Sequence, residues 1–168
     1  RPQYLLALSE AIEEAGADLG YRWYGNRALM SLRLEKGWGA WGLEFRPDFN
    51  AVESGMDAFI NWNKDFVGKE ATQAFKDQGV ERKLVTLTVD TPIDVTLDEA
   101  VLVDGEAVGY ITSGSFAHHV EQSMAMAYVA TPFADAGAKV TVEILGEMHD
   151  AVIMGAPAYD PNGGRMRS

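Results

Sequence analysis

The sequence predicts an α+β protein in which helices come first and a small antiparallel β-barrel or sandwich follows. Up to about residue 82, apolar residues recur at the spacing of amphipathic helices; beyond it they alternate with polar residues, as in half-buried strands. Acidic residues also become concentrated at the same point. We therefore expect two domains, residues 1–83 and residues 84–168.

Three helices are expected before residue 82, over residues 2–15, 27–36 and 65–78. The first is amphipathic, because Leu5, Leu8 and Ile12 share one stripe. In the second, the side chain of Asn26 can cap the first turn and Gly37 can end the helix. These patterns place two helices before the glycine-rich run at 37–42 and one after it.

Six short strands are expected after residue 83, over residues 84–90, 100–103, 106–113, 123–129, 139–145 and 148–154. In the first of them Val85, Leu87 and Val89 point to one face. Asp104 and Gly105 join the second and third strands as a hairpin, since both residue types accept the positive φ angles of a type I′ turn.

The charge balance excludes some functions. Fourteen Lys and Arg against 25 Asp and Glu give a net charge of −11, which argues against nucleic-acid binding because phosphate contacts need a basic surface. Residues 1–47 are neutral, however, while residues 84–162 carry −11. The absence of cysteine excludes disulfides and thiolate metal sites. The sequence contains no apolar run of about 18 residues, so no membrane span is predicted.

Candidate catalytic residues are few. His118 and His119 are adjacent, so on a strand they would point to opposite faces, and two surface histidines are favoured over a metal site. Ser115 lacks the glycine pattern of a nucleophile elbow, which favours a turn. Neither position predicts a catalytic group or a metal ligand.

The neutral N-terminal half contains the other candidates. Arg33 and Glu35 are two residues apart on a helix and do not face each other, so each is expected to pair with another residue. Trp38 and Trp41 lie in a glycine-rich run, where they serve either as core residues or as faces that stack on a planar ligand. From the residues alone, both readings remain open.

Five blocks of sequence, in order along almost the whole chain, resemble the folate-dependent aminomethyltransferase family. They are SLRLEKG at 31–37, AWGLE at 40–44, DFVGKEA at 65–71, VGYITSG at 108–114 and MAMAYV at 124–129. This family includes the glycine cleavage T-protein and the C-terminal regions of dimethylglycine and sarcosine dehydrogenases. The apolar Leu29 and the Trp-Gly continuation of the first block resemble the dehydrogenase-linked branch. The resemblance implies the C-terminal part of the T-protein fold, with helices of the folate-binding region followed by a small antiparallel β-barrel.

The resemblance also implies a cofactor and a set of binding residues. Tetrahydrofolate is the expected cofactor, FAD is a candidate for an upstream domain, and a small methylated amine is the expected substrate. The T-protein has a folate-contacting arginine where this chain has Leu29. The candidate cofactor-binding residues are therefore Arg27, two residues earlier, Arg165 near the C-terminus, and Trp41 as a stacking face. The family's catalytic aspartate would lie upstream of Arg1, so no catalytic residue is expected in this chain.

We therefore expect part of a tetrahydrofolate-dependent aminomethyl transferase, within or derived from a dimethylglycine or sarcosine dehydrogenase-type enzyme. The fragment alone is expected to be inactive, cytoplasmic, and to expose apolar helix faces that upstream domains of the same parent chain would cover. Two alternatives stay open. One is a non-catalytic scaffold or subunit-contact module, suggested by Leu29 and the missing aspartate. The other is a related folate-dependent S- or O-demethylase.

Overall fold

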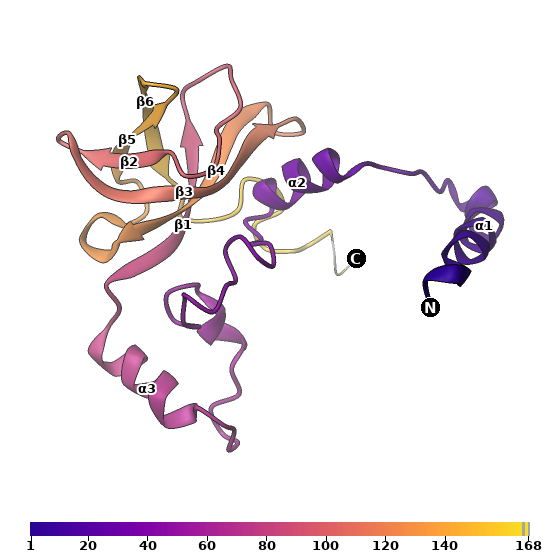
Figure 1. The fold of residues 1–168 in the computed structure, drawn as a ribbon, viewed down its shortest axis with the longest axis horizontal. Coiled ribbons are helices and arrows are strands. Elements are labelled where there is room, and N and C mark those ends of the chain that lie inside the picture. The colour runs from indigo at the N-terminus through magenta and orange to yellow at the C-terminus, as the bar shows by residue number, and fades with distance from the viewer. Residues whose placement is uncertain (166, 168) are drawn as a thin grey trace.

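A computed structural model describes residues 1–165 and 167. The helices are α1 (Leu5–Gly16), α2 (Asn26–Glu35) and α3 (Lys69–Gln78), with short 3-10 turns at Pro2–Tyr4, Ala17–Leu19, Met56–Phe59 and Thr131–Phe133. Figure 1 shows α1 at the end of an extended linker, away from the strands, whereas α2 lies against them. The chief contacts of α2 with the strands are with β3 and β4.

Six strands form one closed antiparallel barrel. They are β1 (Arg82–Val89), β2 (Ala100–Val103), β3 (Glu106–Ala117), β4 (Gln122–Ala130), β5 (Lys139–Ile144) and β6 (Glu147–Ile153). The order around the barrel is β1-β4-β3-β2-β5-β6, and β6 pairs with β1 to close it. The expected α+β fold with a C-terminal antiparallel barrel is confirmed, and of barrel and sandwich the barrel is correct.

The barrel core is built from the alternation seen in the sequence. Side chains from every strand meet inside it, including the fully buried Leu87, Val101 and Ile111. Strand β4 is buried on both faces over 123–129, because its outward-facing residues are covered as well. Outside the barrel, Met124 and Met126 pack with Leu34 of α2 in a second apolar cluster. This cluster fixes α2 on the barrel surface.

The predicted helix starts differ from the observed ones. Asn26 is the first residue of α2, and the capping position falls on Gly25, with no side-chain cap. The prediction that Asn26 caps the helix is therefore wrong. Helix α3 begins at Lys69 rather than Asp65, because Gly68 has a left-handed φ of 88° that interrupts helical geometry. The ends at Gly37 and Gly79 agree with the prediction.

The turn between β2 and β3 is the predicted one. Asp104 and Gly105 have φ angles of 51° and 82°, both positive as a type I′ turn requires. Strand β3 extends to Ala117, four residues beyond its predicted end, and pairs with β4 over most of that length. This extension places the turn between β3 and β4, which contains both adjacent histidines, beside α2. The division into domains at residues 83 and 84 stays a prediction.

Candidate functional site

A cavity of about 500 Å³ lies beside α2, where the helix, the residues after it, the β3–β4 turn and the C-terminal segment meet. Its volume is in the range of small-molecule sites. The lining combines apolar and aromatic side chains with several charged groups. The lining residues are Tyr24, Leu29, Leu32, Arg33, Glu35, Lys36, Trp38, His119, Tyr159, Asp160 and Arg165.

Helical periodicity explains which residues of α2 line the cavity. Leu29, Leu32, Arg33 and Lys36 recur at the three- and four-residue spacing that places side chains on one helix face. The fully buried Leu34 packs instead against the barrel cluster. Helix α2 therefore presents one face to the barrel and an adjacent face to the cavity.

Two side chains of α2 hold the β3–β4 turn in place. The Ser31 hydroxyl donates to the carbonyl of Phe116 at 3.1 Å and accepts the backbone N–H of His118 at 3.2 Å. Glu35 Oε1 accepts the backbone N–H of His119 at 2.9 Å. These bonds fix the turn so that His119, but not His118, reaches the cavity lining.

Arg33 is a buried charge on the cavity wall, with a side chain only 8% exposed. Its Nη1 lies 3.0 Å from Glu44 Oε2 and also donates to the carbonyl of Trp38 at 3.1 Å. Burial lowers the pKa of Arg33, and the Glu44 carboxylate acts in the opposite direction. The Nε and Nη2 atoms of Arg33 have no hydrogen-bond partner among the described residues. Buried donors without partners are costly, so these two nitrogens are suited to meet acceptor atoms of a ligand.

The carboxylate of Glu44 is fully buried, and each of its oxygens has two partners. Oε2 accepts the Arg33 bond and the backbone N–H of Ala40 at 2.7 Å. Oε1 accepts the hydroxyls of Thr112 at 2.7 Å and Ser113 at 2.6 Å, both from β3. The prediction that Arg33 pairs away from Glu35 agrees with this arrangement.

The C-terminal segment lines another part of the cavity, through Tyr159, Asp160 and Arg165. The backbone N–H of Tyr159 donates to the carbonyl of Glu35 at 2.9 Å, and Lys36 Nζ lies 3.2 Å from Asp160 Oδ2. Desolvation favours a higher pKa for Asp160, but the hydrogen bonds from Lys36 and from the backbone of Arg165 outweigh it and hold the pKa below its usual value. Arg165 Nη1 donates to the Tyr159 hydroxyl at 3.1 Å. The segment thus brings a second arginine to the cavity.

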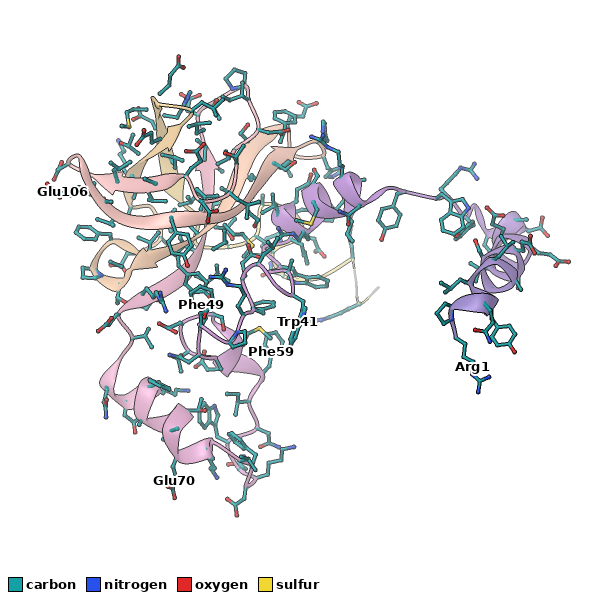
Figure 2. All side chains as sticks on the ribbon, viewed as in Figure 1. Arg1, Trp41, Phe49, Phe59, Glu70 and Glu106 are labelled. Atoms are coloured by element: carbon teal, nitrogen blue, oxygen red, sulfur yellow. The ribbon has the colours of Figure 1, made fainter. Side chains whose placement is uncertain are left out.

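The three predicted cofactor-binding residues lie in different places. Arg165 lines the cavity. Arg27 points to solvent, with a side chain 92% exposed, and pairs with Asp94 at 3.1 Å. Trp41 is 91% exposed on the loop after α2, away from the barrel, as Figure 2 shows. The core reading of Trp41 is therefore wrong, whereas its binding role and that of Arg27 stay predictions.

Sequence reasoning missed Arg33, Lys36 and His119 as cavity residues. The spacing from Leu29 to Lys36 on one helix face was the signal that could have found the first two. For His119 the sequence holds no such signal, because its place depends on where the β3–β4 turn meets α2. Within residues 1–165 and 167, no cluster of three or more His, Asp or Glu side chains could hold a metal ion.

Two family models together match most of the chain. Residues 1–64 match the family model of the GCVT N-terminal domain, and residues 82–160 match that of the glycine cleavage T-protein C-terminal barrel domain. The chain belongs to the glycine cleavage T-protein family. This is a family of folate-dependent one-carbon transferases, and the two matches lie in the family's order along most of the chain.

Individual relatives support the same assignment. The chain is 41% identical to human mitochondrial dimethylglycine dehydrogenase over 155 residues, which is 90% of this chain and 18% of that protein. It is 38% identical to an aminomethyltransferase of Picosynechococcus over 144 residues, 84% of this chain and 40% of that protein. The crystal structure of the glycine cleavage aminomethyltransferase of Bartonella henselae superposes with a TM-score of 0.84 and 25% identity, over 94% of this chain and 44% of that one.

The chain thus spans less than half the length of these relatives. In the part of the chain that the structure describes, no helix is both long and apolar enough to cross a membrane. Because relatives include a mitochondrial and a bacterial enzyme, the cytoplasmic location stays a prediction.

Proposed function

We propose that this chain forms part of a tetrahydrofolate-dependent aminomethyl transferase and that the cavity beside α2 holds part of the reduced folate. The observation that carries the proposal is the lining itself. Apolar side chains of Leu29, Leu32 and Trp38 share one cavity with the cationic groups of Arg33 and Arg165. A folate combines flat ring systems with carboxylates, so it needs both kinds of wall.

The unpartnered nitrogens of Arg33 support the fit. A guanidinium has five N–H donors in a fixed plane and suits carboxylate or carbonyl oxygens. Arg33 uses Nη1 within the protein, while Nε and Nη2 have no partner there. An acceptor group of the folate would satisfy them. Arg165 and Lys36 add positive charge to the same cavity, although Lys36 is already paired with Asp160.

In this proposal the chain supplies binding and orientation. Tetrahydrofolate, when bound, would supply the nitrogen that accepts a one-carbon unit already at the oxidation level of formaldehyde, either from an aminomethyl donor or from a methylated amine that FAD in another domain has oxidised. Holding a reactant in a fixed orientation raises its effective concentration and accounts for a large share of a transfer reaction's acceleration. Leu29, Leu32 and Trp38 would exclude water from one side of the folate, and Arg33 and Arg165 would fix its polar groups.

We further propose a parent enzyme of the dimethylglycine or sarcosine dehydrogenase type, which would add FAD in another domain. The identity to the human dehydrogenase supports this assignment. The S- or O-demethylase alternative shares the folate site and differs only in substrate. Arg27 and Trp41 remain candidates for parts of a folate that extend beyond the cavity, as both are exposed.

Calorimetric titration of tetrahydrofolate into the full natural chain that carries this sequence tests the proposal. We expect saturable binding to one site. Arg165→Gln should weaken it about tenfold, the effect of one lost charged hydrogen bond. Lys64→Gln, which removes an exposed charge outside the cavity lining, is the matched control and should leave affinity unchanged.

The scaffold alternative makes the opposite prediction. It is favoured by the apolar side chains of α1, which are exposed and would suit a subunit contact. If the natural chain is folded and binds no tetrahydrofolate, the transferase proposal is wrong and the scaffold function is favoured.

A further inference from the structure

A buried carboxylate connects the barrel to the cavity wall. We propose that Glu44 is a positioning residue for the site: anchored by two hydroxyls of β3, it fixes the guanidinium of Arg33 in the orientation that meets the ligand. This inference rests on the proposed function, since the ligand that Arg33 would meet is the folate. It gives the barrel a role in binding. Among the described residues, the barrel region contributes only His119, from the β3–β4 turn, to the cavity lining itself.

The bonding of Glu44 leaves its carboxylate no freedom to rotate. Thr112 and Ser113 both donate to Oε1, and the backbone N–H of Ala40 donates to Oε2. The Tyr128 hydroxyl also donates to the backbone carbonyl of Glu44 at 2.9 Å. Donors from two strands and one loop therefore hold the residue, and the remaining contact of Oε2 is with Arg33.

Arg33 is held by one nitrogen only. Glu44, the carbonyl of Trp38 and, at 3.6 Å, the sulfur of Met126 all accept from Nη1, while Nε and Nη2 have no partner among the described residues. Because a guanidinium is planar and rigid, fixing Nη1 against these acceptors also fixes the plane of the other two nitrogens. The buried edge formed by Nε and Nη2 is thus left without a partner, and a ligand group that reached it would meet the fork geometry that binds carboxylates with two parallel hydrogen bonds.

Stability alone gives no good reason for such a pair. Taking two charges out of water costs nearly as much as their attraction returns, so a buried ion pair contributes little net stability. The burial of Arg33 and Glu44 is instead explained if the oriented guanidinium serves the cavity that it lines. Arg33 is then a ligand-binding group, and Glu44 acts through it.

The chain offers a matched control for this idea. Arg82 Nε and Glu53 Oε1 also lie 3.0 Å apart, and Glu53 is also buried. Arg82 stacks on Phe49, however, and neither residue of this second pair lines the cavity. Loss of the Glu53 charge therefore disturbs an ion pair of the same length, whose arginine is 40% exposed, without touching the proposed site.

The test compares Glu44→Gln with Glu53→Gln in the full natural chain. Affinity for tetrahydrofolate is measured by calorimetry, at a temperature where thermal melting shows both variants folded. We expect Glu44→Gln to weaken binding about tenfold or more, because an unanchored guanidinium loses charged hydrogen bonds to the ligand. Glu53→Gln should change affinity less than about twofold. Equal losses in both variants, or none in Glu44→Gln, would overturn the proposal.

A second measurement does not depend on folate. Nuclear magnetic resonance of the arginine side chains reports whether the guanidinium N–H protons of Arg33 are fixed. We expect resolved, slowly exchanging signals in the wild-type chain and in Glu53→Gln, and their loss in Glu44→Gln. If the wild-type chain binds no folate, the proposed function fails, while this measurement still decides whether Glu44 orients Arg33.

A milder variant covers the case in which Glu44→Gln does not fold. Ser113→Ala removes one donor to Oε1 and keeps the charge of Glu44. We expect it to weaken tetrahydrofolate binding by about two- to fivefold and to speed the exchange of the Arg33 protons, in line with the loss of one hydrogen bond. Unchanged exchange together with unchanged affinity would contradict a positioning role.

Discussion

The barrel (residues 82–153) and the helical region before it (residues 1–81) are stabilised in different ways. In the barrel, side chains from all six strands are buried together, and β6 pairs with β1 so that the sheet has no free edge. In α1, every residue from Leu5 to Gly16 is exposed or half-buried, although the helix has a clear apolar stripe. The barrel covers its own apolar surface, whereas α1 does not.

Helix α2 stands between these extremes. One of its faces is buried against the barrel through Leu34, and an adjacent face lines the cavity. The site is therefore built on a helix that packs against the barrel, and no residue of α1 is among its described lining residues. The two regions differ in what a single substitution should do, and the following experiments measure that difference.

The largest difference is expected from a pair of leucines. Leu87→Ala empties part of the closed core and should lower the free energy of unfolding by about 2–5 kcal/mol. Leu8→Ala, at a side chain 56% exposed in α1, should change it by less than about 0.5 kcal/mol. Urea unfolding of the 168-residue chain, followed by circular dichroism, measures both. Similar losses in the two variants would remove the contrast between the regions.

A second test probes how closely two strands approach in the barrel. A Cβ added at Gly109 would lie 2.3 Å from the carbonyl oxygen of Tyr128, on the neighbouring strand. Gly109→Ala should therefore force β3 and β4 apart and cost about 1–3 kcal/mol. Gly164, near the C-terminus, would place a Cβ no closer than 3.7 Å to any other atom, so Gly164→Ala should be almost neutral. Thermal melting distinguishes the two variants.

A third test concerns the exposed stripe of α1. The isolated 168-residue chain should bind a hydrophobic dye such as anilinonaphthalene sulfonate, because Leu5, Leu8 and Ile12 form a contiguous apolar face. Replacing all three by Gln should reduce dye fluorescence severalfold while the barrel melts at the same temperature. A chain that binds no dye would show that α1 covers its stripe in solution.

The smallest effect is expected at the C-terminal segment. The pKa of Asp160 is depressed in the folded chain, so the ionised carboxylate contributes to the stability of the folded state. This stabilisation is complete above the ordinary aspartate pKa near 3.9 and is lost as the pH falls through the lower pKa of the folded chain. The amide resonance of Tyr159 should shift over that acidic range. Asp160→Asn should abolish the shift, and an inflection at or above 3.9 would contradict the depressed pKa.

Local patterns in the sequence were sufficient to predict the strands. The alternation of Val85, Leu87 and Val89 reflects a pleated strand with one buried face, and Asp104-Gly105 reflects the geometry of one turn. Both depend on neighbouring residues only. The closure of β6 on β1 depends on pairing between distant segments, so the choice between barrel and sandwich could not be made from pattern.

The cavity was harder to predict for the same reason. Arg33 pairs with Glu44, which lies on a loop of irregular backbone. Glu44 in turn accepts a hydrogen bond from Thr112 of β3, which is 68 residues further along the chain. Arg165 was found through family resemblance. The C-terminal segment meets α2 through the bond from the Tyr159 N–H and through Lys36, which contacts both the carboxylate and the backbone carbonyl of Asp160. Asn26 shows the converse error: a good capping residue is one position too late to cap.

The positions of the tryptophans have a practical consequence. All four precede residue 63, and the barrel contains none. Red-edge excitation of the intact chain therefore yields emission from the helical region alone. Trp38 on the cavity wall would report ligand entry, and the exposed Trp41 would report the loop after α2. Unfolding of the barrel would reach these emitters through its contacts with α2 and with the loop that contains Glu44. A lag between fluorescence and circular dichroism would therefore reveal whether the two regions unfold as one cooperative unit.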